Sequence, residues 1–141
     1  MKIVLDTNVL IVSFSKKSKY YWIWEGLLRG EYILCITTDI LLEYEEIITQ
    51  QTNSIISEAV LDAITDLPNL VYVTKYIFWQ LINEDPDDNK FVDCAIASNA
   101  RYIVSEDKHF NILKSIDFPK VDVLRINAFL NILTKKNNPQ K

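Results

Sequence analysis

The sequence of 141 residues contains only two glycines, Gly26 and Gly30. Sites of the usual kind for dinucleotides or nucleoside triphosphates need several glycines directly after a strand, because the backbone must come close to the phosphates. The shortage of glycine therefore argues against both classes of cofactor.

Cysteine and histidine are equally scarce: the chain has Cys35, Cys94 and a single histidine, His109. Each cysteine lies in an apolar stretch, which predicts reduced, packed thiols and neither a disulfide framework nor a thiolate metal site. No nucleophile motif accompanies His109, so a Ser-His-Asp triad is not expected. We expect His109 to be a surface or packing residue.

Long apolar runs are absent as well. The first such run, Ile3 to Leu5, is stopped at once by Asp6, so neither a signal peptide nor a membrane-spanning segment can be read from the sequence. These absences predict a cytoplasmic protein without a membrane partner.

Positive charge is also in short supply, since the net charge is −4 and the pI is about 5.0. This is the wrong sign for a protein that holds nucleic acid by its overall charge. A nucleic-acid role would need a local basic cluster, such as Lys16, Lys17 and Lys19, or divalent cations that reverse the sign of an acidic cleft. We expect the lysine cluster to be a solvated loop.

What the sequence does contain is an alternation of short β-branched runs with amphipathic stretches. This alternation is typical of an α/β fold in which helices cover both faces of a parallel sheet. The length fits one domain over residues 1–133, followed by a polar tail at 134–141 that we expect to be disordered. Strands are expected at residues 2–5, 32–36, 70–73, 102–105 and 121–124, and helices at 20–28, 37–48, 54–66, 75–82, 89–99 and 125–133.

Four acidic residues lie close to the carboxyl ends of the expected strands. Asp6 closes the first strand, and Glu43 lies in the early turns of the helix after the second. Asp93 is near the start of the helix before the fourth strand, and Asp107 follows that strand. Ligands of open parallel sheets bind beyond the carboxyl ends of the strands. The topology therefore predicts that all four acids meet at one edge of the sheet.

Each acid also has an ordinary structural explanation. Asp6 is as well suited to form a turn as to serve a site, and Glu43 flanks the apolar stripe of its helix much as Glu45 does. Asp107 is equally suited to cap a helix, with Glu106 as a rival for its role.

Asp93 is different, because it lies in a helix that is otherwise apolar nearly all round. A carboxylate in such a helix is costly unless a positive group compensates it, and this favours a functional role.

Converging carboxylates would need cations. Two of them about 4 Å apart repel by roughly 4 kcal/mol at an effective dielectric constant of 20. Ligands that are all oxygen suit Mg²⁺ or Mn²⁺, whereas zinc prefers clusters of Cys and His. The sequence therefore predicts Mg²⁺ or Mn²⁺ as the cofactor.

Four blocks of sequence, in this order, resemble the PIN domain family, especially proteins described as toxin components of bacterial and archaeal toxin–antitoxin pairs. The resemblance extends from Met1 to about Leu133. The blocks are residues 3–10 (IVLDTNVL), 42–44 (LEY), 85–95 (DPDDNKFVDCA) and 102–110 (YIVSEDKHF).

The resemblance implies a three-layer α/β/α fold with a central, mainly parallel sheet of about five strands, and a ribonuclease that depends on Mg²⁺ or Mn²⁺. It implies an acidic core that also holds the metal, with two supporting polar groups. The core would be Asp6, Glu43, Asp93 and Asp107, and the supporting groups would be Asn8 and Ser105. On this basis, Asp6→Asn or Asp93→Asn is expected to abolish RNA cleavage.

Two further acids are placed less directly by the resemblance. Asp88 is expected to cap the helix that follows it, or to act as an outer acid of the metal site. Glu106 departs from the family pattern, in which a small residue such as glycine precedes Asp107, and it would either crowd the site or add an oxygen to it.

The resemblance also implies partners: an RNA substrate, a cognate antitoxin protein, and further copies of the chain in a homodimer or higher oligomer. An aromatic cluster, Tyr20, Tyr21, Trp22 and Trp24, would serve such an interface or the core equally well.

Three alternatives stay open. The chain could be an RNA-processing nuclease outside any toxin–antitoxin pair, or a PIN-like domain that binds RNA or protein without catalysis. A phosphatase with Asp6 as nucleophile is a weaker alternative, because Asn8 stands where such an enzyme has its second acid.

Overall fold

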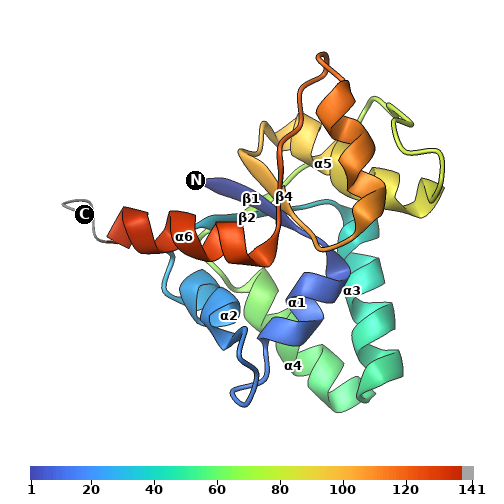
Figure 1. The fold of residues 1–141 in the computed structure, drawn as a ribbon. Helices are drawn as coiled ribbons and strands as arrows, with labels where there is room; N and C mark the ends of the chain where they lie inside the picture. Colours follow the sequence, from blue (N-terminus) through green and yellow to red (C-terminus); the bar gives the residue numbers. More distant parts are fainter. Residues whose placement is uncertain (138–141) are drawn as a thin grey trace.

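The computed structural model describes residues 1–137. Helices and strands alternate along this part of the chain (Figure 1). The strands are β1 Lys2–Leu5, β2 Ile33–Ile36, β3 Leu70–Tyr72, β4 Tyr102–Val104 and β5 Val123–Leu124. The α-helices are α1 Thr7–Ser13, α2 Tyr21–Leu28, α3 Thr38–Gln51, α4 Ser54–Thr65, α5 Asn89–Ser98 and α6 Ile126–Asn137, and two 3₁₀ segments are η1 Pro86–Asp88 and η2 Lys108–Ser115.

The sheet has five strands in the order β3-β2-β1-β4-β5, and every pair of neighbours is parallel. β1 lies at the centre, where Ile3 pairs with Leu34 on one side and with Tyr102 on the other. Ile3, Val4 and Leu5 are fully buried, as expected for a parallel strand covered on both faces. The predicted parallel sheet of about five strands is therefore confirmed.

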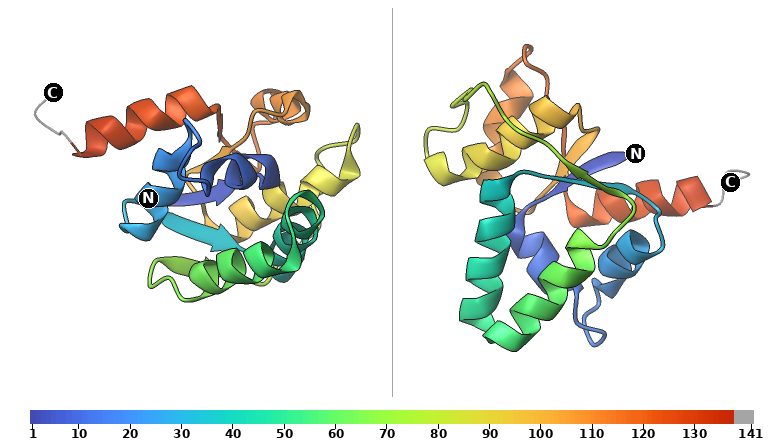
Figure 2. Two further views of the ribbon diagram at one scale, coloured as in Figure 1. Left: turned by 90° about the horizontal axis from the view of Figure 1, so that it is seen from below. Right: turned by 180° about the vertical axis from the view of Figure 1, so that it is seen from behind.

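Helices lie on both sides of the sheet and make three layers. In Figures 1 and 2, α5 and η2 lie on one side, and α1, α2, α4 and α6 lie on the other. The side chains of α2 and α6 meet where the ring centroids of Trp22 and Phe129 are 5.8 Å apart. Trp24 is buried, and Tyr20, Tyr21 and Trp22 are partly buried against the core. Core packing therefore explains most of the aromatic cluster.

The buried face of α3 follows the apolar stripe predicted from the sequence. Ile40, Tyr44 and Ile48 are spaced by four residues and are fully buried, as an amphipathic stripe requires. The Tyr44 hydroxyl donates a hydrogen bond to the Leu5 carbonyl oxygen (2.6 Å). This contact holds the start of α3, where Glu43 lies, against the end of β1.

Two predictions about local structure are wrong. The chain does not simply turn at Asp6 but enters α1 at once, with Val9 N and Leu10 N donating to the Asp6 carbonyl (3.0 and 3.1 Å). The expected helix at 75–82 is irregular chain. Gln80 has a left-handed φ of 52°, and the Asn89 side chain binds the N–H and C=O of Ile82 (2.9 and 2.8 Å), so side chains satisfy the backbone there.

The C-terminal boundary also differs from the prediction. α6 continues to Asn137, so residues 134–137 of the expected disordered tail are helical, and residues 138–141 of that tail lie outside the described residues. The segment η2 was not predicted at all. Within residues 1–137, no helix has the length and apolar character needed to cross a membrane.

Other expectations about side chains are confirmed. Cys35 and Cys94 are buried free thiols, and Lys16, Lys17 and Lys19 are exposed in the loop between α1 and α2.

Candidate metal centre

Asp6 lies at the carboxyl end of the central strand. Its backbone N–H donates to Val104 of β4 (3.1 Å), and its side chain makes no hydrogen bond that caps α1. The residue is 6% exposed. Burial raises the pKa of the Asp6 carboxyl, and the charges of Asp107 and Glu43 raise it further, against hydrogen bonds from Ser105 and Thr7 that lower it. The Asp6 carboxylate is therefore buried at the carboxyl edge of the sheet, beside other acids.

Ser105 links Asp6 to Asp107. Its hydroxyl donates to Asp6 Oδ2 (2.7 Å) and accepts from Asp107 N (3.0 Å). Ser105 is 1% exposed, so its hydroxyl is shielded from solvent and bonds to protein groups. Asp107 itself caps η2, because its Oδ1 accepts from His109 N (2.9 Å). Asp107 therefore both caps η2 and lies beside Asp6.

Asp88 is the third acid of this group. It is the last residue of η1, directly before α5, and it is 9% exposed. Burial raises the pKa of Asp88 to about 7, and repulsion by three other carboxylates adds to the effect. These are Asp85, Asp107 and Asp6. Its Oδ2 is buried and has no hydrogen-bond partner among the described residues.

The side chain of Asp88 therefore does not cap α5 in the way that the sequence predicted. Its backbone is itself helical, and no hydrogen bond from this side chain to the helix is present in the described part of the chain. The carboxylate faces the other acids instead, where burial and like charges oppose its ionisation and the nearby His109 favours it.

Glu43 lies beside Asp6 but has its own partners. Its Oε2 accepts from the Thr7 hydroxyl, and its Oε1 forms an ion pair with Lys90 Nζ (2.7 Å). The side chains of Lys90 and Glu43 are 14% and 15% exposed. Lys90 also pairs with Asp87 (2.8 Å). A lysine therefore stands next to this acid and offsets part of the local negative charge.

Asp93, which the sequence predicted to belong to the acidic core, has partners other than Asp6, Asp88 and Asp107. Its Oδ1 accepts from Trp79 N (3.1 Å). Burial raises its pKa, while Trp79 N–H and Lys75 lower it and Asp39 raises it. Asp93 follows Asp88 by five positions, and five positions of an α-helix are a rotation of about 140° from the starting direction. Asp88 and not Asp93 therefore faces Asp6.

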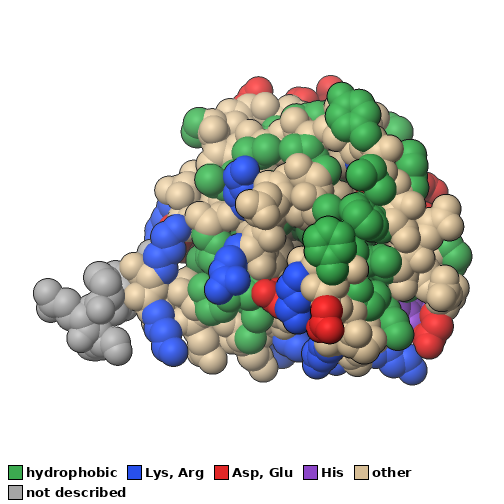
Figure 3. All heavy atoms as spheres, turned by 90° about the horizontal axis from the view of Figure 1, so that it is seen from above, with side chains coloured by type: hydrophobic (Ala, Val, Ile, Leu, Met, Phe, Trp, Pro, Cys, Tyr) green, Lys and Arg blue, Asp and Glu red, His purple; other side chains and the backbone are tan. Residues whose placement is uncertain are grey.

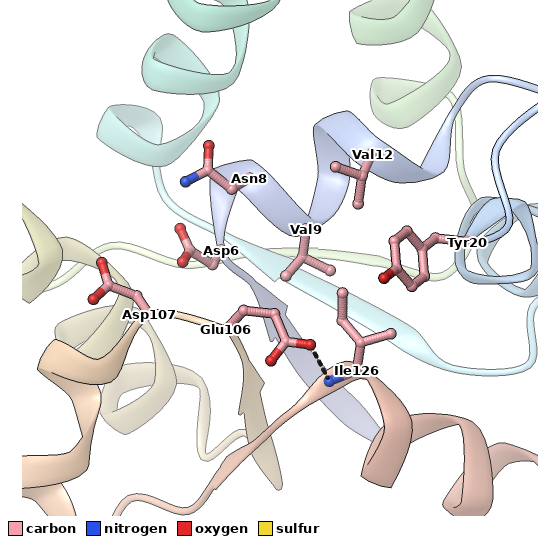
Figure 4. A pocket seen from close by; sticks show the side chains of 8 residues that line it. All are labelled: Asp6, Asn8, Val9, Val12, Tyr20, Glu106, Asp107 and Ile126. Atoms are coloured by element: carbon pink, nitrogen blue, oxygen red, sulfur yellow. Dashed lines mark hydrogen bonds between the residues drawn. The ribbon is translucent and has the colours of Figure 1, made fainter.

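A pocket of about 410 Å³ opens beside the acids. Figure 4 shows Asp6, Asn8 and Asp107 at one end and an apolar wall at the other. The wall consists of Val9, Val12, Tyr20 and Ile126. Asn8, predicted as a supporting group, lies next to Asp6 in this view.

Glu106 lines the same pocket without joining the acids. Its Oε1 accepts from Ile126 N (3.3 Å), and its Oε2 pairs with Arg125 (3.0 Å). These partners hold the Glu106 carboxylate at the N-terminus of α6, where a negative charge is favourable.

The structure therefore brings three carboxylates together at the carboxyl edge of β1 and β4, with a fourth beside Asp6. The three are Asp6, Asp88 and Asp107, and the fourth is Glu43. All their candidate ligand atoms are carboxylate oxygens, the ligand type that Mg²⁺ and Mn²⁺ take. Among the described residues, Asp88 Oδ2 is buried without a hydrogen-bond partner, and His109 Nδ1 lies 3.5 Å from it.

Two residues near these acids were not assigned this place by the sequence. Asp88 was treated as an outer acid or a cap, and His109 as a packing or surface residue. The run Asp85-Pro86-Asp87-Asp88 could have indicated the place of Asp88, because acids just before the start of a helix can face the end of a sheet. No sequence signal indicated that His109 lies next to Asp88.

Comparisons with known proteins agree with this fold. A sequence model of the family described as PIN domain matches residues 2–109. The fold is similar to that in the crystal structure of VapBC2 from Rickettsia felis bound to a DNA fragment from their promoter, with a TM-score of 0.62 and 19% sequence identity. That match covers 89% of this chain and 98% of the other. No match is found among curated proteins.

Proposed function

We propose, from the premise that the chain belongs to the PIN domain family, that it is a metal-dependent ribonuclease. The observation that carries the proposal is the convergence of Asp6, Asp88 and Asp107, together with the buried, unpartnered oxygen of Asp88. Asp6 and Asp88 are buried and their pKa values are raised, and a bound cation would stabilise their ionised forms.

Mg²⁺ or Mn²⁺ is the cofactor that these side chains fit. Asp6, Asp88 and Asp107 would hold it, with Glu43 as a further ligand. When bound, such an ion lowers the pKa of a water molecule and stabilises the charge that grows on the leaving oxygen of a phosphodiester. The ion also supplies the positive charge that an RNA backbone needs in a protein of net charge −4.

The surrounding residues fix the direction of these carboxylates. Ser105 holds Asp6 through a hydrogen bond of 2.7 Å. The Thr7 hydroxyl and Lys90 hold the two oxygens of Glu43. Pre-positioned ligands of this kind lower the cost of binding an ion, because little freedom is lost when it arrives. The pocket beside Asp6 and Asp107 gives a substrate access to the same edge.

A role as the toxin of a toxin–antitoxin pair is part of the proposal. It is supported by the likeness of the fold to VapBC2 of Rickettsia felis. The partners would then be RNA as substrate, a cognate antitoxin that holds the chain inactive, and a second copy of the chain. Growth arrest on expression of this chain, relieved by the product of a neighbouring gene, would distinguish this role from RNA processing.

The test of the enzyme is cleavage of a mixed RNA substrate with Mn²⁺ and with chelator. We expect cleavage with Mn²⁺, none with chelator, and a loss of at least about 100-fold in Asp6→Asn and Asp88→Asn, because each removes a charge that holds the ion. Asp93→Asn should retain activity, since an amide oxygen can still accept from Trp79 N.

Asp62→Asn, on the exposed side of α4, is a matched control that should cleave like the natural protein. Full activity in a correctly folded Asp6→Asn protein would overturn the proposal. Tight Mn²⁺ binding without cleavage of any RNA would favour the non-catalytic alternative.

A further inference from the structure

His109 lies at the start of η2, directly beside the acids. Its Nδ1 is 3.5 Å from Asp88 Oδ2 and 3.3 Å from Asp107 Oδ1. Its Nε2 is 3.5 Å from Glu84 Oε2. Figure 3 shows the histidine side chain at the edge of one face, next to acidic side chains. The only imidazole of the chain is therefore surrounded by carboxylates.

Two atoms of this arrangement lack a partner. Asp88 Oδ2 and His109 Nδ1 are buried, and neither has a hydrogen-bond partner in the described part of the chain. At 3.5 Å they are too far apart for a good hydrogen bond with each other. Leaving two buried polar atoms unsatisfied costs free energy, and such pairs call for a bound group.

Asp85 completes a set of three. One ligand atom each from Asp85, Asp88 and His109 can be chosen so that all three lie within 4.8 Å of one another. Ligands of an ion with bonds of about 2.1 Å lie about 3–4 Å apart. A small closure of these side chains therefore brings them to the separation that one ion requires.

His109 has carboxylates beside both ring nitrogens, with Asp88 and Asp107 beside Nδ1 and Glu84 beside Nε2. An ion bound at Nδ1 would require the ring proton to be on Nε2, where Glu84 is the nearby carboxylate. A metal-binding histidine commonly has this arrangement, in which a carboxylate behind the ring orients it.

We propose that Asp85, Asp88 and His109 form a second divalent-metal site beside the first, and that its imidazole nitrogen makes it select Mn²⁺ over Mg²⁺. Mg²⁺ binds oxygen almost exclusively, whereas Mn²⁺ accepts a mixed set of nitrogen and oxygen. This proposal departs from the expectation that His109 is a surface or packing residue. The inference rests on the proposed function only in that both sites use Asp88.

The experiment is pulsed EPR of Mn²⁺ bound to the untagged full-length protein. Because His109 is the only histidine, an imidazole ¹⁴N coupling to bound Mn²⁺ can come from no other side chain. We expect this coupling in the natural protein, its loss in His109→Gln, and its retention in Asp62→Asn. The same samples give the affinities for Mn²⁺ and Mg²⁺ by competition.

The preference for Mn²⁺ over Mg²⁺ should fall by about tenfold or more in His109→Gln, because its only nitrogen ligand is lost. Asp85→Asn, which keeps the imidazole, should weaken Mn²⁺ binding at this site and diminish the coupling. Unchanged circular dichroism in both variants shows that the fold is intact. The side chain of His109 is 28% exposed, so its replacement leaves the core in place.

Bound Mn²⁺ without any imidazole coupling would overturn the inference and leave the proposed ribonuclease intact. An unchanged metal preference in His109→Gln would also overturn it. Imidazole coupling in a protein that cleaves no RNA would instead sustain the second site and refute the proposed function.

Discussion

Replacing Asp88 by Asn should stabilise the metal-free protein at neutral pH. The substitution keeps the size of the side chain, removes its charge, and adds an N–H that neighbouring carboxylates can accept. In the natural protein the pKa of Asp88 is raised from 3.8 to about 7, first by burial and then by Asp85, Asp107 and Asp6. The ionised side chain is therefore unfavourable in the fold.

The size of the effect follows from the pKa. A rise from 3.8 to about 7 corresponds to a free-energy cost of about 4 kcal/mol when Asp88 is ionised, at about 1.4 kcal/mol for each pH unit. Neighbouring acids share the same protons, so the change measured for Asp88→Asn should lie between about 1 and 4 kcal/mol.

The sign of the pH dependence is also defined. Between pH 3.8 and about 7, the folded chain keeps a proton on Asp88 that the unfolded chain has released. The contribution of this group to the free energy of unfolding therefore falls as pH rises through this range, and its full cost is present above about pH 7. Asp88→Asn should thus gain little at pH 4 and most at pH 8.

Urea unfolding in chelator at pH 4, 6 and 8 measures this difference, with Asp62→Asn as control. An equal change in the free energy of unfolding at all three pH values would refute the reasoning, because a charge effect must vanish where Asp88 is protonated. With Mn²⁺ present, the natural protein should have the higher free energy of unfolding and Asp88→Asn the lower, since only the natural protein gains the full stabilisation from binding.

Two further predictions concern other parts of the fold. Lys90→Met, which leaves Glu43 without its cation in a site that is 15% exposed, should lower the free energy of unfolding in chelator by about 2–4 kcal/mol; a change below about 0.5 kcal/mol in urea unfolding would contradict it. Asn99→Ala should cost about 1 kcal/mol, because Asn99 ends α5 with a left-handed φ of 57° that a β-carbon disfavours. Thermal unfolding measures this cost, and Asn99→Gly, with no β-carbon, should be close to neutral.

The sequence was sufficient for the architecture and for part of the site. Apolar strand residues such as Ile3 and Val4 identify a strand buried on both faces, and the alternation with helices then limits the sheet to a parallel one. Asp6 follows directly, because a residue after the central strand must lie at its carboxyl edge. Ser105 was indicated by the family resemblance, and it lies directly after β4, the neighbour of β1.

The choice between Asp88 and Asp93 required information that the sequence does not carry. Burial of an acid within an apolar helix was taken to indicate a functional residue, but Trp79 N–H satisfies Asp93 from an irregular segment. The direction of a helical side chain depends on where the helix begins and how it is rotated. In this protein, η1 and the packing of α5 determine where this helix begins and how it is rotated. Asp88 and Asp93, five positions apart, therefore point in different directions.

The same limit explains the failure at residues 75–82. The apolar spacing there is compatible with a helix, yet Asn89 and Asp93 bind its backbone from another element. Contacts between residues distant in sequence override local propensity. The partners of His109 are of this type too, since Asp88 and Glu84 reach it from a separate loop.

The order of the strands has a consequence during synthesis of the chain. β4 lies between β1 and β5, and Asp107 follows it, so a nascent chain that ends before residue 102 lacks both this acid and the strand that positions it. The carboxylates are contributed at residues 6, 43, 88 and 107. A ribosome making this protein therefore carries an incomplete set of these carboxylates until residue 107 has been added.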